Sequence, residues 1–150
     1  MHANIEPDLS GVMFSLFSGD VDHNNGASIS IMIGGWQPDK GHVELDFHSS
    51  EFAELISTNG ALADHLVATG ANILEPEIGA LRRRGHPVKD HPEPYDYVQG
   101  WKMFFPASSP HWYQAIALAT DTYPTNNGAV FTFGTPDTYP AILNTWPKNS

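Results

Sequence analysis

The pattern of hydrophobic and polar residues predicts three short strands in the first third of the chain. Apolar residues fill 12–17, and they alternate with small or polar residues over 27–33. Over 42–48 ionisable and apolar residues alternate without a break, as expected for a strand with one buried face. Asn25-Gly26 favours a hairpin between the first two runs. The first third is therefore predicted to be a three-stranded antiparallel meander.

Helix end signals follow the third strand. Serine at the start and Asn-Gly at the end predict a helix from Ser49 or Ser50 to about residue 59. A second short helix is expected over 61–69, with Leu62 and Leu66 as its apolar stripe and glycine after it. Proline near the start and glycine after the end predict a third helix over 75–85.

The second half predicts two strands and two helices. The expected strands span 95–105 and 129–133, and the expected helices run from Ser109 to about 119 and from Thr135 to near 146. Trp112 and Ile116 are expected on the buried side of the first of these helices. The fold class is a single α+β domain over 1–150, with a mainly antiparallel sheet of about five strands. The helices are expected on one face, in the order βββ-αα-β-α-β-α.

Composition limits the class of protein. A chain of 150 residues with 41% hydrophobic residues can bury a substantial core, and the absence of cysteine excludes disulfides and thiolate metal sites. No apolar run is long enough to span a bilayer, and the acidic Met1–Ser10 does not resemble a signal peptide. We expect a cytoplasmic protein without a membrane partner.

The formal net charge of −10 is placed unevenly along the chain. Residues 1–81 carry twelve acidic and one basic side chain, a balance of −11, whereas residues 82–150 carry six basic and five acidic, a balance of +1. An acidic field repels phosphate backbones and attracts basic proteins. We therefore expect no direct nucleic-acid partner and favour a basic protein partner.

The strand over 42–48 carries four ionisable side chains on one predicted face, His42, Glu44, Asp46 and His48. Neighbours two positions apart can bind one ion, so either His42 with Glu44 or Asp46 with His48 could be a ligand pair. A third ligand would have to come from elsewhere. The candidates are Asp20, Asp22, His23, His86, His91 and His111. The alternative is that this row is the solvated face of an ordinary sheet, with Val43, Leu45 and Phe47 facing the core.

Two further groups suggest binding. Arg82, Arg83 and Arg84, with Lys89 nearby, could hold an anion, or could complement the end of the predicted helix over 75–85. Aromatic residues next to turns are candidate interface anchors or could close the ends of the sheet. They are Trp36, Tyr95, Tyr97, Tyr113, Tyr123, Tyr139 and Trp146.

The chain lacks the nucleophile elbow G-x-S-x-G and the glycine-rich phosphate loops. The favoured function is an acidic binding or inhibitory module, such as a toxin neutraliser or a phage-type inhibitor, which needs no cofactor. Trp36, Glu44, Asp46, Tyr95 and Tyr97 are its candidate contact residues. The alternative is a small metal-dependent enzyme that uses the row over 42–48 and a divalent metal. A homodimer is one alternative for the oligomeric state.

Overall fold

The computed structural model describes residues 2–6, 11–18, 27–33, 41–47, 50–82 and 100–147. Over the first four ranges it describes the strands and their pairing. The chain divides into two compact units, Met1–Leu55 and Ile56–Ser150, and each is described by itself. The expectation of one domain over 1–150 stays a prediction.

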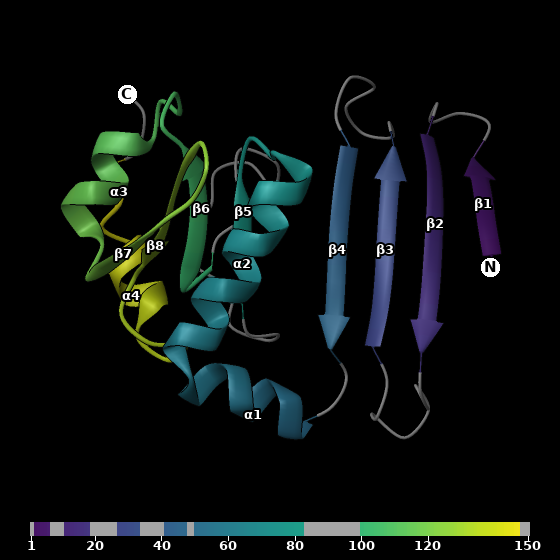
Figure 1. The fold of residues 1–150 in the computed structure, drawn as a ribbon, viewed down its shortest axis with the longest axis horizontal. Coiled ribbons are helices and arrows are strands. Elements are labelled where there is room, and N and C mark those ends of the chain that lie inside the picture. Colours follow the sequence, from purple (N-terminus) through teal and green to yellow (C-terminus); the bar gives the residue numbers. More distant parts are fainter. Residues whose placement is uncertain are drawn as a thin grey trace. The chain divides into compact units, whose positions relative to one another are not determined.

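The first unit contains a four-stranded antiparallel sheet (Figure 1). Its strands follow chain order: β1 (His2–Glu6), β2 (Gly11–Ser18), β3 (Ala27–Ile33) and β4 (Gly41–Phe47). The three predicted strands are confirmed, with the bounds of β3 unchanged. Sequence reasoning missed β1, because its five residues include only two apolar positions of a strand pattern, Ala3 and Ile5.

Two helices follow the first sheet, α1 (Ser50–Thr58) and α2 (Gly60–Leu74). Asn59 caps α2, because its side-chain Oδ1 accepts a hydrogen bond from the backbone N–H of Leu62 at 3.1 Å. The predicted end at Gly70 is wrong, since α2 continues for another turn until Glu75 adopts the left-handed conformation with φ 47°. The predicted stripe is also displaced: Leu62 and Leu66 are half-buried, whereas α2 buries Ala63, Asp64, Ala68 and Ala71.

The second unit contains another four-stranded antiparallel sheet, in the order β5-β6-β8-β7. Its strands are β5 (Gly79–Leu81), β6 (Lys102–Pro106), β7 (Asp121–Pro124) and β8 (Gly128–Thr132). The α+β class is confirmed, but the described residues form eight strands, not about five, in a different order. The predicted helix over 75–85 is wrong, because β5 occupies its middle and pairs with β6.

The second sheet is covered by helices on both faces, so the prediction of one covered face is wrong for this unit. On one face, α2 packs Ala68 and Ala71 against Phe104 and Val130. The other face is aromatic, and α3 (Trp112–Leu118) sets Trp112 edge-on to Phe131 at 5.1 Å between ring centroids.

The aromatic face also holds the end of the described chain. The Trp146 ring lies about 6 Å from those of Phe105 and Phe133, just after α4 (Tyr139–Leu143). Tyr139 and Trp146 are buried, which corrects their interpretation as surface anchors. Ile116, predicted to be buried, is half exposed, because Ala115 is the buried residue of α3.

Candidate functional site

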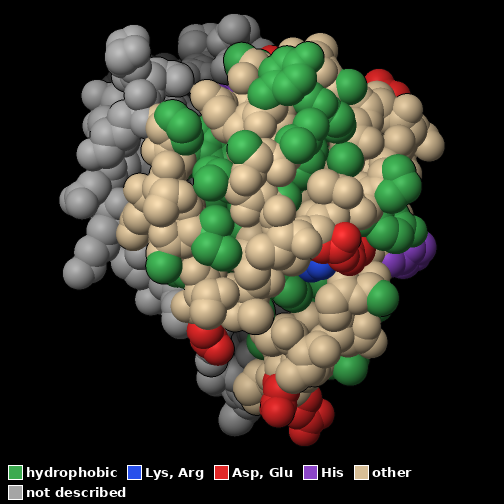
Figure 2. Space-filling model, turned by 90° about the vertical axis from the view of Figure 1, so that its left-hand side faces the viewer, with side chains coloured by type: hydrophobic (Ala, Val, Ile, Leu, Met, Phe, Trp, Pro, Cys, Tyr) green, Lys and Arg blue, Asp and Glu red, His purple; other side chains and the backbone are tan. Residues whose placement is uncertain are grey.

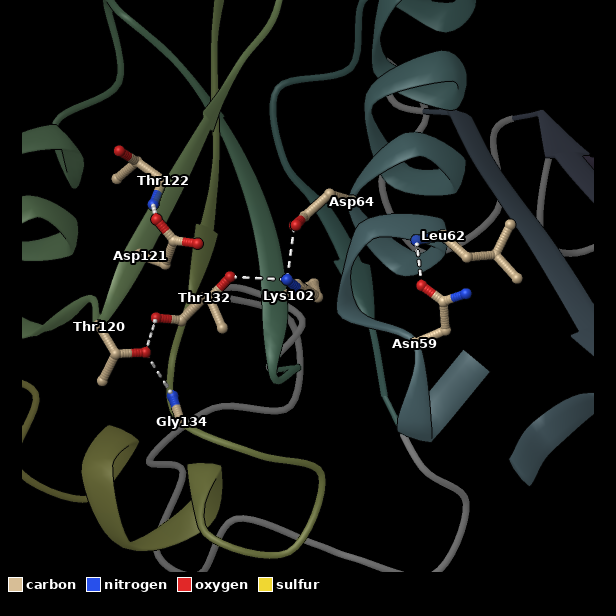
Figure 3. Close-up of polar contacts among 9 residues, drawn as sticks. All are labelled: Asn59, Leu62, Asp64, Lys102, Thr120, Asp121, Thr122, Thr132 and Gly134. Atoms are coloured by element: carbon tan, nitrogen blue, oxygen red, sulfur yellow. Dashed lines mark hydrogen bonds and ion pairs between the residues drawn. The ribbon is translucent and has the colours of Figure 1, made fainter. Parts of the chain in front are cut away.

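A row of polar residues crosses the second sheet on the face that α2 covers. Lys102 of β6 pairs with Thr132 of β8, and Thr132 pairs with Asp121 of β7. Directly opposed residues of antiparallel strands project to the same face of the sheet, so these three side chains form one row. Figure 3 shows Asp64 reaching from α2 toward the Lys102 end of this row.

Lys102 is buried and carries a paired charge. Its side chain is 3% exposed, and the ammonium Nζ donates to Asp64 Oδ1 at 2.6 Å and to Thr132 Oγ1 at 2.8 Å. The ammonium also lies 5.1 Å from the centre of the Trp101 ring. Burying a charge is costly unless it is paired and hydrogen-bonded, and both conditions hold here. This contact therefore joins α2 to two strands, and its charge is already matched within the protein.

The other end of the row lies at an open edge. β7 is the last strand in the order of this sheet, and all four of its residues are exposed. The N–H of Thr125 donates to the carbonyl of Gly128 at 3.0 Å, so these two residues form a hydrogen-bonded pair. In antiparallel strands such pairs alternate with pairs that are not hydrogen-bonded. Counting back from Thr125, Tyr123 and Asp121 therefore direct their backbone N–H and C=O groups to β8, whereas Pro124 and Thr122 direct theirs outward.

The outward edge of β7 presents backbone carbonyl groups that can accept hydrogen bonds but no free backbone N–H that could donate one. The N–H of Thr122 donates to the Oδ1 of Asp121 at 2.8 Å, and Pro124 has no N–H. The carbonyls of Thr122 and Pro124 remain as outward acceptors. Edge strands without available donors are poor templates for another strand, so this edge is protected against strand pairing.

Large apolar side chains are exposed on the second unit. Tyr113 and Ile116 of α3 are 83% and 52% exposed, and Tyr123 of β7 is 40% exposed. Figure 2 shows hydrophobic side chains over the face of this unit where α3 and β7 lie. Tyr113 and Tyr123, two of the candidate interface anchors, are thus exposed to solvent.

The described side chains also give an acidic surface. Within residues 50–82 and 100–147, one basic side chain, Arg82, is exposed, while Lys102 is buried. Asp64 is the buried carboxylate. The six exposed carboxylates are Glu51, Glu54, Glu75, Glu77, Asp121 and Asp137. Acidic groups therefore dominate the charged surface of this part of the chain.

The predicted metal row lies on β4, for which the structure describes pairing. His42, Glu44 and Asp46 stand opposite Met32, Ser30 and Ser28, so the three occupy alternate positions of one strand. His48 and His23 lie outside the described residues, as do Asp20, Asp22, His86 and His91. His111 packs its ring 5.9 Å from that of Phe105. Among the described side chains, no group of three or more potential ligands could hold a metal ion. Metal binding by the row stays a prediction.

The arginine cluster begins immediately after β5. Arg82 is exposed, and Arg83, Arg84 and Lys89 lie outside the described residues. The explanation through a helix end is wrong, because the element that ends immediately before Arg82 is the strand β5 and not a helix. Arg82 instead acts on Tyr139: burial raises the pKa of the Tyr139 phenol, and the positive charge of Arg82 partly opposes this rise.

The candidate aromatic contact residues Trp36, Tyr95 and Tyr97 also lie outside the described residues.

Sequence reasoning missed the Asp64–Lys102 contact and the edge of β7. One signal for the contact was available: Lys102 is the one charged residue among five positions, 101–105, that are otherwise apolar. A lysine in such a stretch needs a buried partner. The stretch Asp121–Pro124 carries no period of apolar residues and thus no strand signal.

Comparison of the chain with protein-family models, curated proteins and solved structures finds no match. No helix among the described residues has the length and apolarity needed to cross a membrane.

Proposed function

We propose that the chain is an acidic binding module that engages a basic protein partner, with neutralisation or inhibition of that partner as its role. The observation that carries this proposal is the imbalance of exposed charge within residues 50–82 and 100–147, where six carboxylates accompany one exposed arginine. Such a surface attracts a basic protein over long range and speeds its association.

Exposed aromatic side chains supply the short-range part of the proposed contact. Tyr113 is 83% exposed on α3, next to the exposed Ile116 on the same helix surface three positions later. Tyrosine is enriched at binding interfaces because it combines apolar area with a polar hydroxyl, and single tyrosines often dominate binding energy. Charge would bring the partner close, and Tyr113 would anchor it.

Salt dependence of capture tests the electrostatic part of the proposal. The protein would be immobilised and incubated with lysate of its own source cells, and bound proteins would be eluted at rising sodium chloride concentration. We expect a basic protein that elutes steeply with salt, because exposed charges are screened within about 10 Å at 0.1 M salt. Retention of acidic proteins, or capture that is insensitive to salt, would contradict the proposal.

A matched pair of variants tests the anchor. Tyr113→Ala should weaken capture of the same basic protein by about tenfold or more, the size of a moderate hot spot of about 1.4 kcal/mol. Ile73→Ala, at a residue that is 74% exposed at the end of α2, is the control and should leave capture unchanged. Equal effects of the two substitutions would show that Tyr113 is not an anchor.

A further inference from the structure

We propose that the outer edge of β7 binds arginine side chains of the basic partner. This inference rests on the proposed function and assigns a binding strip, defined as the Asp121 carboxylate, the Thr122 and Pro124 carbonyls and the Tyr123 ring. All four residues are exposed. The strip deepens the proposal by naming the chemical group that the module would recognise.

The backbone of the strip matches a guanidinium group by its hydrogen-bonding type. Its outward donors are removed, because the Thr122 N–H is held by Asp121 at 2.8 Å and Pro124 has none. The outward carbonyls stand two residues apart, or about 7 Å along the strand. A guanidinium carries five N–H donors and no acceptor, so an edge that offers only acceptors is complementary to it.

The side chains of the strip add charge and an aromatic face. Asp121 and Tyr123 pair with Thr132 and Val130 of β8, so they project to the same face of the sheet at neighbouring positions. The Asp121 carboxylate keeps acceptor capacity after its bond to Thr122, since a carboxylate can accept about four hydrogen bonds. The Tyr123 ring, 40% exposed, offers a surface on which a guanidinium can stack.

The neighbouring lysine does not compete for the strip. Lys102 on β6 lies in the same row as Asp121 on β7, two strands away from it, and the Lys102 ammonium donates to Asp64 and Thr132. The negative charge of Asp121 is therefore available to a cation from outside. An incoming strand is a worse occupant than arginine, because strand addition needs edge donors as well as acceptors.

Peptide titration tests the strip directly. Fluorescently labelled oligoarginine and oligolysine peptides of equal length would be titrated with the whole protein and followed by anisotropy. We expect oligoarginine to bind about tenfold more tightly, because the planar guanidinium can bond two acceptors and stack on the ring. Amide signals of Thr122 and Tyr123 should shift in NMR spectra when oligoarginine is added.

Three variants separate the strip from general charge attraction. Asp121→Asn keeps an oxygen that can hold the Thr122 N–H but removes the charge, and Tyr123→Ala removes the ring. Each should weaken oligoarginine binding by about threefold to tenfold, with the melting temperature of the protein as a check on folding. Glu51→Gln, at another exposed carboxylate, is the control and should change binding by less than about twofold.

The outcomes distinguish this inference from the proposed function. Equal affinity for the two peptides, or equal effects of Asp121→Asn and Glu51→Gln, would overturn the strip and leave a generally acidic binding module. Absence of peptide binding, or self-association through β7, would overturn the strip as well. Oligoarginine binding that requires Asp121 and Tyr123, without salt-sensitive capture of a basic protein, would support the strip and contradict the proposed function.

Discussion

The ammonium group of Lys102 lies 2.6 Å from a carboxylate oxygen of Asp64 and so joins β6 to α2 across 38 positions of the chain. The lysine side chain is 3% exposed and the aspartate side chain 12%. Each charge depends on the other, because water reaches neither side chain to a large extent. The pairing therefore links the folding of α2 to that of the second sheet.

Replacement of Lys102 by methionine is expected to lower the free energy of unfolding by about 3 kcal/mol. The variant keeps the apolar stem but leaves the Asp64 carboxylate buried without a cation, and loss of one partner from a buried pair costs about 3–5 kcal/mol. We place the effect at the lower end because Asp64 retains some contact with water. Urea unfolding followed by circular dichroism measures the change.

The double variant Asp64→Leu with Lys102→Met provides the control for this prediction. Replacement of both charges by apolar groups of similar size is often nearly neutral, so the double variant should regain most of the stability lost by Lys102→Met alone. If the double variant is as unstable as the sum of the two single variants, the residues are not energetically coupled.

Gly70→Ala is expected to raise the free energy of unfolding by about 0.5–1 kcal/mol. Gly70 lies inside α2, and a Cβ added there would meet no other atom within 4 Å. Alanine is more favourable than glycine inside a helix by about this amount. Thermal unfolding would show the gain. Gly128→Ala should instead destabilise the protein, because its Cβ would collide with the carbonyl oxygen of Phe105.

Asp121→Ala is expected to promote self-association through β7. The substitution removes the acceptor that holds the Thr122 N–H at 2.8 Å and so gives the outer edge a free donor. Light scattering coupled to size-exclusion chromatography would detect larger species that increase with protein concentration. Asp121→Asn retains an acceptor oxygen, and it should behave like the original protein. Equal association of both variants would point to charge loss and not to edge pairing.

Stability is expected to fall as pH rises above about 10, in part through Tyr139. Burial raises the pKa of this phenol above its ordinary value of 10.0, so the folded state keeps the proton after the unfolded state has lost it. Because the folded state then binds more protons than the unfolded state, the free energy of unfolding decreases as pH rises above about 10. The contribution of the protonated Tyr139 phenol to stability is complete below that pH. Urea midpoints between about pH 8 and about pH 11 measure the trend.

Tyr139→Phe isolates this contribution. The phenylalanine variant cannot ionise at position 139, so its midpoint should fall less steeply above about pH 10 than that of the original protein. Parallel curves for the two proteins would show that the Tyr139 phenol does not contribute to alkaline unfolding.

Three of the four strands of the first sheet, β2, β3 and β4, were predictable because their signals are local. The regular alternation in 27–33 predicts the extent of β3, and the dipeptide Asn25-Gly26, as a turn signal in the sequence, predicts its antiparallel pairing with β2; both predictions agree with the structure. Glycine predicted the end of a helix less well. Gly70 was interpreted as a helix end, but contacts of Ala68 and Ala71 with the sheet carry α2 past it.

The features of the second sheet depend on contacts between distant segments. A proline and a glycine around 75–85 suggested a helix, yet pairing of β5 with β6 determined its conformation. Lys102 could be recognised as unusual in its apolar stretch, but no local pattern identifies Asp64 as its partner. Likewise, the donor-free edge of β7 depends on the register with β8, which sets Thr122 outward.

The alanines of α2 determine how closely the helix approaches the sheet. Ala68 and Ala71 place only methyl groups between the helix backbone and Phe104 and Val130. A lysine side chain has a limited reach, so the Lys102 ammonium meets Asp64 only if the helix axis stays near the strands. Larger side chains at these alanines would lift the helix and draw the two charges apart. Uncharged methyl groups thus control the strength of an electrostatic contact.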